Sequence, residues 1–212
     1  GHVILTFREA VGPCALITPW NFPAAMLTRK LGPAFAAGCT AVVKPASQTP
    51  FTAIALAELA YRAGLPKGAL SVITGDAATI GGVLTASPLI RKLSFTGSTP
   101  VGRKLAEQCA PSLKRVSMEL GGAAPLMVFE DADLDLAVAE TIKGKFRNSG
   151  QTCVCPNRVY VHASVAEEYA TKLAAEVAKT PVGPAFEDGV KVGPLIEDKA
   201  IDKVEDHLKR VQ

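Results

Sequence analysis

Residues 11–44 read VGPCALITPWNFPAAMLTRKLGPAFAAGCTAVVK, and this stretch decides the predicted fold. Its first part, residues 11–18, is an apolar run with the length of a buried strand. Residues 22–37 predict a helix, which Gly38 ends because glycine accepts the left-handed backbone that follows many helices. Residues 39–44 are rich in β-branched side chains and predict a second strand. A strand, a helix and a strand in this order predict parallel strands with a helix packed against them.

The same alternation continues to residue 119. Proline in the first turn and Gly64 just past the end mark the helix that follows the second strand. The further expected elements are helices at 50–63, 77–85 and 98–109, and strands at 70–74, 91–95 and 114–119. This order predicts an α/β fold, a Rossmann-like parallel sheet that is covered by helices on both faces.

The pattern changes at Gly121-Gly122, so a domain boundary is expected near Leu120. Acidic residues open the next helix, where they lie at the positive end of its dipole. The expected elements of this part are strands at 125–129 and 158–162, helices at 131–147, 164–179 and 198–212, and a loop at 181–194. They predict the beginning of a second α/β domain.

Composition excludes several classes of protein. The 212 residues carry a net charge of +3 without a Lys/Arg cluster, which argues against nucleic acid and membrane surfaces as partners. No apolar run approaches the ~20 residues of a membrane-spanning helix. Five cysteines are an odd number and no secretory leader is present, so reduced thiols and a cytoplasmic location are expected. Three scattered histidines form no metal-ligand spacing, so no metal site is predicted.

Two residues supply the parts of a covalent mechanism. Cys153 lies in the run GQTCVCPNR at 150–158, and Glu119 lies in SMELGG at 117–122. A thiol can act as a nucleophile and a carboxylate as a base. Each has a plainer interpretation, because an isolated cysteine is usually an inert core residue and an isolated glutamate is usually a surface acid.

Two further motifs favour the catalytic interpretation of Cys153 and Glu119, namely PWNFP at 19–23 and VKPAS at 43–47. With these four motifs in this order and spacing, the chain resembles the aldehyde dehydrogenase superfamily, and within it the succinate-semialdehyde dehydrogenases. The runs ITPWNFPAAM, KPASQTPF, LSFTGST and KFRNSGQTCVC carry the resemblance. It extends over nearly every residue present but over less than half of a family subunit, which implies a part of a longer chain that self-associates when complete. It also implies that residues 1–120 are part of a nucleotide-binding domain and that 121–212 begin a catalytic domain.

The resemblance implies roles for three residues. Cys153 attacks the aldehyde to give a thiohemiacetal, which loses hydride and leaves a thioester, and Glu119 activates the water that cleaves the thioester. Asn21 and the backbone N–H of Cys153 stabilise the oxyanion, although asparagine is also a common turn residue. A thiol acyltransferase or a CoA-acylating dehydrogenase is an alternative that needs no base, and Glu119 argues against it. A fragment that binds dinucleotide weakly without catalysis is a second alternative.

The cofactor site has no G-x-G-x-x-G motif. Gly97 and Ser98 instead open a helix, whose free N–H groups can bind a pyrophosphate. The segment is not a P-loop, because Arg103 occupies the position where a P-loop requires lysine. The resemblance implies that the cofactor contacts Trp20, Asn21, Lys44, Pro45, Ala46, Ser47, Gly97, Ser98 and Leu120. Ser47 occupies the position where NAD-preferring relatives carry glutamate, which favours NADP, although a serine that tolerates both NADP and NAD is the alternative.

The substrate site is expected to hold a carboxylate. Arg29 lies eight residues after Asn21, which places the two about two helical turns apart, and Arg147 lies six before Cys153. The resemblance implies that both arginines bind the far carboxylate of a small semialdehyde, with two solvated surface arginines as the alternative. Succinate semialdehyde is expected, and glutarate semialdehyde or a broad range of aldehydes stays open, because one methylene changes binding by only ~1–3 kcal/mol.

Two details near the motifs stay open. Cys155 lies two residues after Cys153, so in an extended chain both thiols would face one side and could form a strained, easily reduced disulfide. Ala123 stands where the family usually has Asn or Lys, which implies different packing near Glu119 without the loss of a chemical group.

Overall fold

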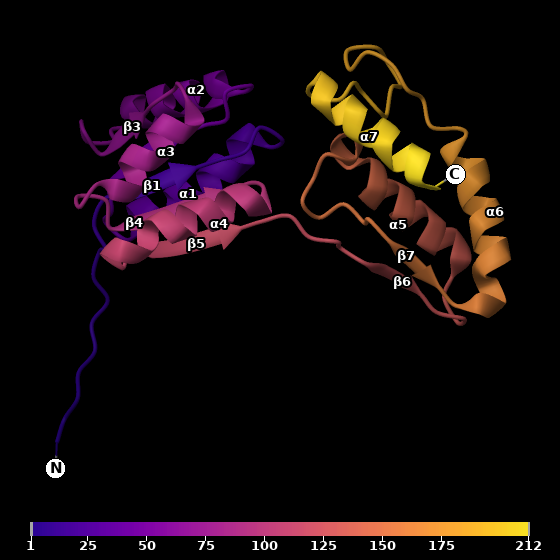
Figure 1. Ribbon diagram of the computed structural model, residues 1–212, viewed down its shortest axis with the longest axis horizontal. Coiled ribbons are helices and arrows are strands. Elements are labelled where there is room, and N and C mark those ends of the chain that lie inside the picture. Colours follow the sequence, from indigo (N-terminus) through magenta and orange to yellow (C-terminus); the bar gives the residue numbers. More distant parts are fainter. Residues whose placement is uncertain (1, 212) are drawn as a thin grey trace. The chain divides into compact units, whose positions relative to one another are not determined.

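The computed structural model of the protein describes residues 2–211. The chain divides into two compact units, Gly1–Gly121 and Gly122–Gln212. Figure 1 shows the helices and strands of each unit in chain order. The roles of the two units as nucleotide-binding and catalytic domains remain predictions.

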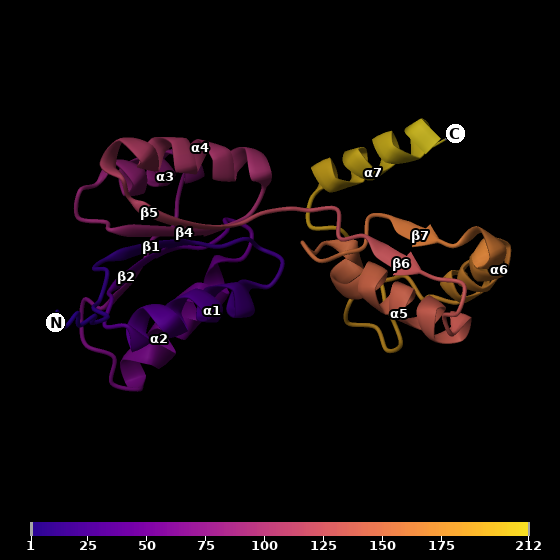
Figure 2. The ribbon, with the colours of Figure 1, turned by 90° about the horizontal axis from the view of Figure 1, so that it is seen from below.

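A parallel sheet forms the centre of the first unit, with the strand order β3-β2-β1-β4-β5. The strands are β1 (Cys14–Ile17), β2 (Ala41–Lys44), β3 (Leu70–Val72), β4 (Lys92–Thr96) and β5 (Arg115–Glu119). The helices are α1 (Pro23–Ala36), α2 (Pro50–Arg62), α3 (Ala77–Ala86) and α4 (Thr99–Cys109), followed by the 3-10 turn Ala110–Ser112. Helices α1 and α2 cover one face of the sheet, and α3 and α4 cover the other (Figure 2). The predicted α/β fold with a parallel sheet is confirmed.

Strand β1 is buried on both faces. Cys14 and Leu16 pack in the cluster beneath α1 and α2, and Ala15 packs in the cluster beneath α3 and α4. Their exposed fractions are 3%, 2% and 0%. A strand that is covered on both faces needs apolar side chains at successive positions, which explains the unbroken apolar run in the sequence.

Helices α1 and α2 end at glycines, as the sequence predicts. Gly38 has φ +75°, and its N–H donates to the carbonyl of Phe35. The N–H of Cys39 donates to the carbonyl of Ala34 at 2.8 Å. This pair of hydrogen bonds satisfies carbonyls that the end of the helix leaves without partners. Helix α2 ends in the same way at Gly64, with φ +95°.

Within residues 122–211, the second unit has two parallel strands and three helices. The strands are β6 (Leu126–Val128) and β7 (Val159–Val161), and the helices are α5 (Leu134–Phe146), α6 (Ala166–Val177) and α7 (Asp198–Val211). Two 3-10 turns, Arg147–Gly150 and Ala163–Val165, follow α5 and precede α6. Tyr169 packs against Val128 and Val138, and its hydroxyl lies 2.6 Å from Oγ1 of Thr141.

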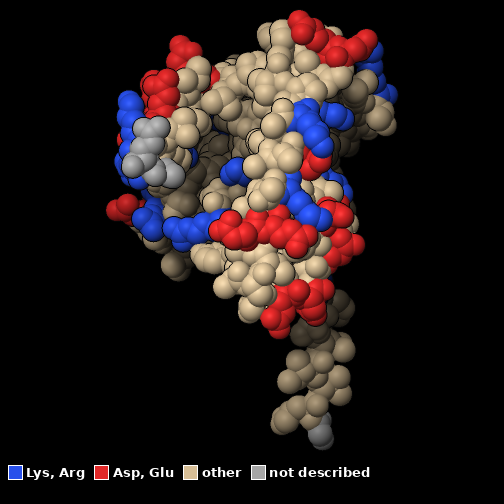
Figure 3. Space-filling model, turned by 90° about the vertical axis from the view of Figure 1, so that its right-hand side faces the viewer, with Lys and Arg blue, Asp and Glu red and all other residues tan. Residues whose placement is uncertain are grey.

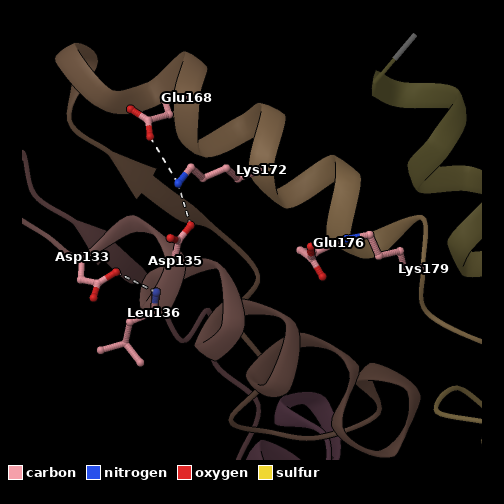
Figure 4. A network of polar contacts seen from close by, with 7 residues as sticks. All are labelled: Asp133, Asp135, Leu136, Glu168, Lys172, Glu176 and Lys179. Carbon is pink, nitrogen blue, oxygen red and sulfur yellow. Dashed lines mark hydrogen bonds and ion pairs between the residues drawn. The ribbon is translucent and has the colours of Figure 1, made fainter.

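Polar contacts fix the start of α5 against α6. The carboxylate of Asp133 accepts a hydrogen bond of 3.1 Å from the backbone N–H of Leu136, which caps α5. Lys172 lies 2.6 Å from Asp135 and 3.4 Å from Glu168 (Figure 4). The hydrogen bond with Asp135 raises the pKa of Lys172. The acidic residues predicted at this helix start therefore act as a cap and as a salt-bridge partner.

Charge is spread over the surface in both signs. Figure 3 shows Lys and Arg side chains lying among Asp and Glu on the face that it displays. Within residues 2–211 no helix has the length and apolar character needed to span a membrane. No cluster of three or more His, Cys, Asp or Glu side chains in this range could hold a metal ion.

Candidate active site

The carboxyl edge of the first unit's sheet carries most of the predicted site. Lys44 ends β2, Thr96 ends β4 and Glu119 ends β5. The strand order runs outward from β1 to β3 on one side and from β4 to β5 on the other. In open α/β sheets ligands bind outside the carboxyl ends of the strands at such a reversal, which here lies between β1 and β4.

Lys44 is buried at this edge, with 5% of its surface exposed. Burial lowers the pKa of Lys44, and the charge of Asp76 opposes that shift. Pro45 is buried, Ala46 is half-buried and Ser47 is exposed. An ammonium group and an exposed hydroxyl three residues later are suitable partners for a ribose or for its phosphate.

The N-terminus of α4 offers groups that an anion could bind. Oγ1 of Thr96 is buried and has no hydrogen-bond partner within the described part of the chain. Ser98 occupies the N-cap position, but its side chain makes no capping hydrogen bond. The unused hydroxyl of Thr96, the uncapped N-terminus and its positive dipole fit a pyrophosphate.

Glycine leaves room for a neighbouring side chain at two positions around this N-terminus. A Cβ atom on Gly97 would lie 2.4 Å from Cζ of Phe95, and one on Gly102 would lie 2.4 Å from Cδ2 of Leu120. The N–H of Gly97 also donates to the carbonyl of Glu119 at 3.0 Å. The hydrogen bond thus joins the main chain of Gly97 to that of Glu119, and the side chain of Leu120 packs closely against α4 at Gly102.

Glu119 lines a cavity on the α1 side of the sheet. The cavity has a volume of about 490 Å³, and Arg29, Lys30, Ser94 and Ser117 also line it. The carboxylate of Glu119 is exposed. Among the residues described, it has no direct hydrogen bond or salt bridge. The predicted base and the predicted Arg29 therefore share one cavity, and the base is open to water.

Lys30 also lines this cavity, although no motif of the sequence marks it as a site residue. Lys30 is 8% exposed and donates to Oγ of Ser94 at 2.8 Å, whereas Arg29 is exposed. Burial lowers the pKa of Lys30 to about 8, and Glu119 acts in the opposite direction. Helical spacing was the available signal, because Lys30 lies four residues after buried Met26 and Arg29 lies off that stripe.

Trp20 and Asn21 lie between β1 and α1, and both are half-buried. Helix α1 begins at Pro23, after Asn21. Asn21 therefore lies outside the helix that carries Arg29, so the predicted separation of two helical turns is wrong. The two residues still belong to one short segment that leaves the carboxyl end of β1.

Cys153 is exposed and lies in a turn of the second unit. The N–H of Val154 donates to Oγ1 of Thr152 at 3.1 Å, and the N–H of Cys155 donates to the Thr152 carbonyl at 3.3 Å. Cys155 is buried, and its thiol donates to the carbonyl of Lys145 at 3.5 Å. The premise of an extended chain with both thiols on one side is wrong, because the chain turns between them.

The segment before Cys153 has an unusual backbone. Asn148 and Ser149 have φ +52° and +55°, and Gly150 has φ +77°. A left-handed backbone at a residue other than glycine, such as Ser149, costs about 1–3 kcal/mol and is found most often at functional sites. Tertiary hydrogen bonds hold this conformation, as Ser149 Oγ accepts from Gly193 N–H at 3.1 Å and Gln151 Oε1 accepts from Ile196 N–H at 2.9 Å.

Arg147 lies in the 3-10 turn that follows α5. It lines a cavity of about 480 Å³ within the second unit. The other charged residues that line this cavity are Lys143, Lys179, Lys191 and Glu176. Four basic groups and one acidic group give the cavity a positive character, which suits an anion.

The sheet and its carboxyl edge define an α/β protein of the open-sheet class, with a thiol in a constrained turn of its second unit. The sequence profile of the aldehyde dehydrogenase family matches residues 1–212. The chain belongs to this family.

Its relatives include semialdehyde dehydrogenases. The chain is 59% identical over 206 residues to glutarate-semialdehyde dehydrogenase of Pseudomonas putida KT2440, with 97% of this chain and 43% of the relative covered. It is 58% identical over 205 residues to the NADP(+) succinate-semialdehyde dehydrogenase GabD of Escherichia coli K12, with 97% and 42% covered. The crystal structure of succinate-semialdehyde dehydrogenase from Burkholderia pseudomallei matches with a TM-score of 0.94 at 58% identity, over 96% of this chain and 42% of that one. The chain thus spans about two fifths of the length of these relatives.

Proposed function

We propose that the full-length protein that contains this chain oxidises succinate semialdehyde to succinate with NADP. The observation that carries this proposal is the accessibility of one thiol. Of the five free cysteines, Cys153 is exposed and the other four are buried. A nucleophilic cysteine must be reachable by its substrate, whereas buried cysteines are inert. Family membership and the constrained turn around Cys153 support the same role.

In the first step Cys153 gives up its thiol proton to solvent, and its sulfur attacks the aldehyde carbon. A C–S bond forms, and the carbonyl oxygen becomes an oxyanion. The side-chain amide of Asn21 and the backbone N–H of Cys153 are the proposed donors to this oxyanion, and such donors contribute about 2.7–4 kcal/mol each. The hydrogen bonds of Ser149 and Gln151 support the role by holding the nucleophile's segment in one conformation.

A bound NADP would supply the acceptor for the hydride that leaves the tetrahedral carbon. Residues of the first unit fit the parts of this cofactor. Lys44 and Ser47 are suitable for the adenosine ribose and its phosphate, and the N-terminus of α4 with Thr96 is suitable for the pyrophosphate. Trp20, Pro45, Ala46 and Leu120 are proposed to pack against it.

Glu119 is proposed to complete the reaction. Loss of hydride leaves a thioester on Cys153, and water must cleave its C–S bond. The carboxylate of Glu119 takes a proton from this water, the acid product leaves and the thiol is restored. Exposure of Glu119 in a cavity that water can enter supports this role. A reaction that transfers the acyl group of the thioester to another thiol would not need Glu119 as a base.

Cofactor choice can be tested at Ser47. We expect the wild-type protein to prefer NADP, and Ser47→Glu to shift the preference towards NAD, because a carboxylate repels a 2′-phosphate and accepts hydrogen bonds from ribose hydroxyls. Steady-state kcat/KM values with both cofactors measure the preference. A wild-type preference for NAD would contradict the assignment.

Substrate choice rests on two arginines. Arg29 lines the cavity that contains Glu119, and Arg147 lines the positive cavity of the second unit. A guanidinium group binds a carboxylate through two parallel hydrogen bonds, so it can select aldehydes that carry a distant carboxylate. Glutarate semialdehyde is the second candidate, and the 59% identity to a glutarate-semialdehyde dehydrogenase supports it. Self-association and a cytoplasmic location stay predictions.

The proposed function can be tested with Arg147→Ala in the full-length protein. Arg147 is exposed, so its pair with the carboxylate would be buried only when the substrate is bound. Truncation of one partner in such a buried charge-assisted pair costs on the order of 2–5 kcal/mol. We therefore expect kcat/KM for succinate semialdehyde to fall roughly 30-fold or more, while kcat/KM for butanal stays nearly unchanged.

Lys143→Ala is the matched control, because Lys143 contributes a positive charge to the same cavity from one helical turn earlier. We expect only a small change from it. Equal losses of Arg147→Ala on both substrates would mean that Arg147 supports the turn around Cys153 and does not bind the carboxylate. Absence of turnover by the wild-type protein with every semialdehyde would contradict the proposed function itself.

A further inference from the structure

Asp76 is a charged residue at the carboxyl edge of the sheet that the proposed reaction does not use. We infer that Asp76 lowers the affinity of the protein for a dinucleotide with a 2′-phosphate, relative to the same dinucleotide without it. The inference rests on the proposed binding of the adenosine ribose beside Lys44. It adds a specificity-determining residue that acts against Ser47.

The position of Asp76 follows from the pairing of β2 and β3. Val43 and Val72 are register partners, and the N–H of Ile73 donates to the carbonyl of Val43 at 2.9 Å. The chain after Val72 therefore runs beside the end of β2, where Lys44 lies. Asp76 comes four residues after Val72, at the N-cap of α3. The carboxyl ends of adjacent parallel strands meet at one edge, so both side chains belong to the same region.

The carboxylate of Asp76 is held in place. One of its oxygens accepts a hydrogen bond of 2.7 Å from the N–H of Thr79, and this bond caps α3. Hydrogen bonds from Thr79 lower the pKa of Asp76, and the charge of Lys44 acts in the same direction. The group is therefore ionised at neutral pH. Its charge also acts on Lys44, where it opposes the effect of burial on the lysine pKa.

Electrostatics then determines the direction of the effect. A 2′-phosphate brings a charge between −1 and −2 to the region of Lys44 and Ser47, and Asp76 brings a charge of −1 to the same edge. Asp76 is exposed, so the repulsion is that of charges in a water-like medium, and we expect it to change affinity by about three- to tenfold. Dinucleotides without the phosphate do not experience this repulsion.

The test is Asp76→Asn in the full-length protein, with equilibrium dissociation constants measured for NADP and NAD at low ionic strength. Asparagine is as good an N-cap residue as aspartate, so α3 keeps its cap while the charge is removed. We expect NADP to bind about three- to tenfold more tightly and NAD to change less than twofold. Salt screens exposed charges, so the gain for NADP should shrink as the ionic strength rises.

Glu58→Gln is the matched control. This substitution removes an exposed carboxylate from α2 that forms a salt bridge with Arg62. Glu58 lies about two helical turns after Pro50, the first residue of α2. This variant should leave the ratio of the two dissociation constants unchanged. An unchanged ratio in Asp76→Asn, an equal change for both dinucleotides, or a gain that persists at high salt would each overturn the inference. If the wild-type protein bound neither dinucleotide, the proposed function would fail first and the inference with it.

Discussion

Replacement of Cys153 by alanine in the full-length protein should abolish both aldehyde oxidation and ester hydrolysis. Removal of a covalent nucleophile typically lowers kcat by several orders of magnitude, so we expect a loss of at least roughly a thousandfold. Initial rates with succinate semialdehyde and NADP, and with a chromogenic ester, measure the two activities. Both should be lost together, because both need the same thiol.

Cys155→Ala is the control for this experiment. Cys155 is buried, and its thiol donates a hydrogen bond to a backbone carbonyl. Removal of this thiol should therefore lower the melting temperature of the protein and leave most of its activity. If Cys155→Ala were inactive and Cys153→Ala active, the nucleophile would be assigned to the wrong cysteine.

Replacement of Glu119 by glutamine should separate the two halves of the reaction. The amide keeps the shape of the side chain but cannot take a proton from water, so we expect one burst of NADPH and then a stall with the thioester in place. Steady-state turnover should fall about 10²–10⁴-fold. Rapid-mixing absorbance measures the burst, and intact-protein mass spectrometry detects the acyl group on the stalled enzyme.

Glu107→Gln is the matched control, because Glu107 is an exposed carboxylate on α4 that has no proposed role. It should behave like the wild-type protein. Turnover of Glu119→Gln at the wild-type rate would show that another group activates the water. Loss of the burst as well would mean that Glu119 is needed before the thioester forms.

The sequence predicts the alternation of helices and strands well, and its errors lie mainly at the ends of elements. The apolar run at 11–18 predicts a strand, but the ladder covers only Cys14–Ile17. The strand is shorter because each residue of β1 must pair with a residue of β2, and β2 begins only at Ala41, the partner of Cys14. The helix expected at 164–179 begins with a 3-10 turn at Ala163–Val165, and its α-helical part is Ala166–Val177. Glycine-terminated helix ends are easier to predict because they depend on local backbone alone.

Parts of the site depend on tertiary contacts that local patterns do not contain. The turn that separates Cys153 from Cys155 follows several residues whose backbone has positive φ. Hydrogen bonds donated by the N–H groups of Gly193 and Ile196 stabilise that conformation. Nothing between residues 147 and 155 indicates those distant partners. Ser98 is a second example, because it stands at an N-cap position without using its hydroxyl there. Lys30 differs from both, since the apolar stripe of α1 does predict its burial.

The hydrogen bonds from Gly193 and Ile196 also bear on the synthesis of the protein. Ser149 and Gly193 are 44 residues apart, and Gln151 and Ile196 are 45 apart. At about 5–20 residues per second, a ribosome adds the later partners roughly two to nine seconds after the earlier ones. During that interval the nascent chain contains Cys153 without the contacts that shape its turn. The arrangement of this thiol is therefore acquired only after β7 and α6 have been made.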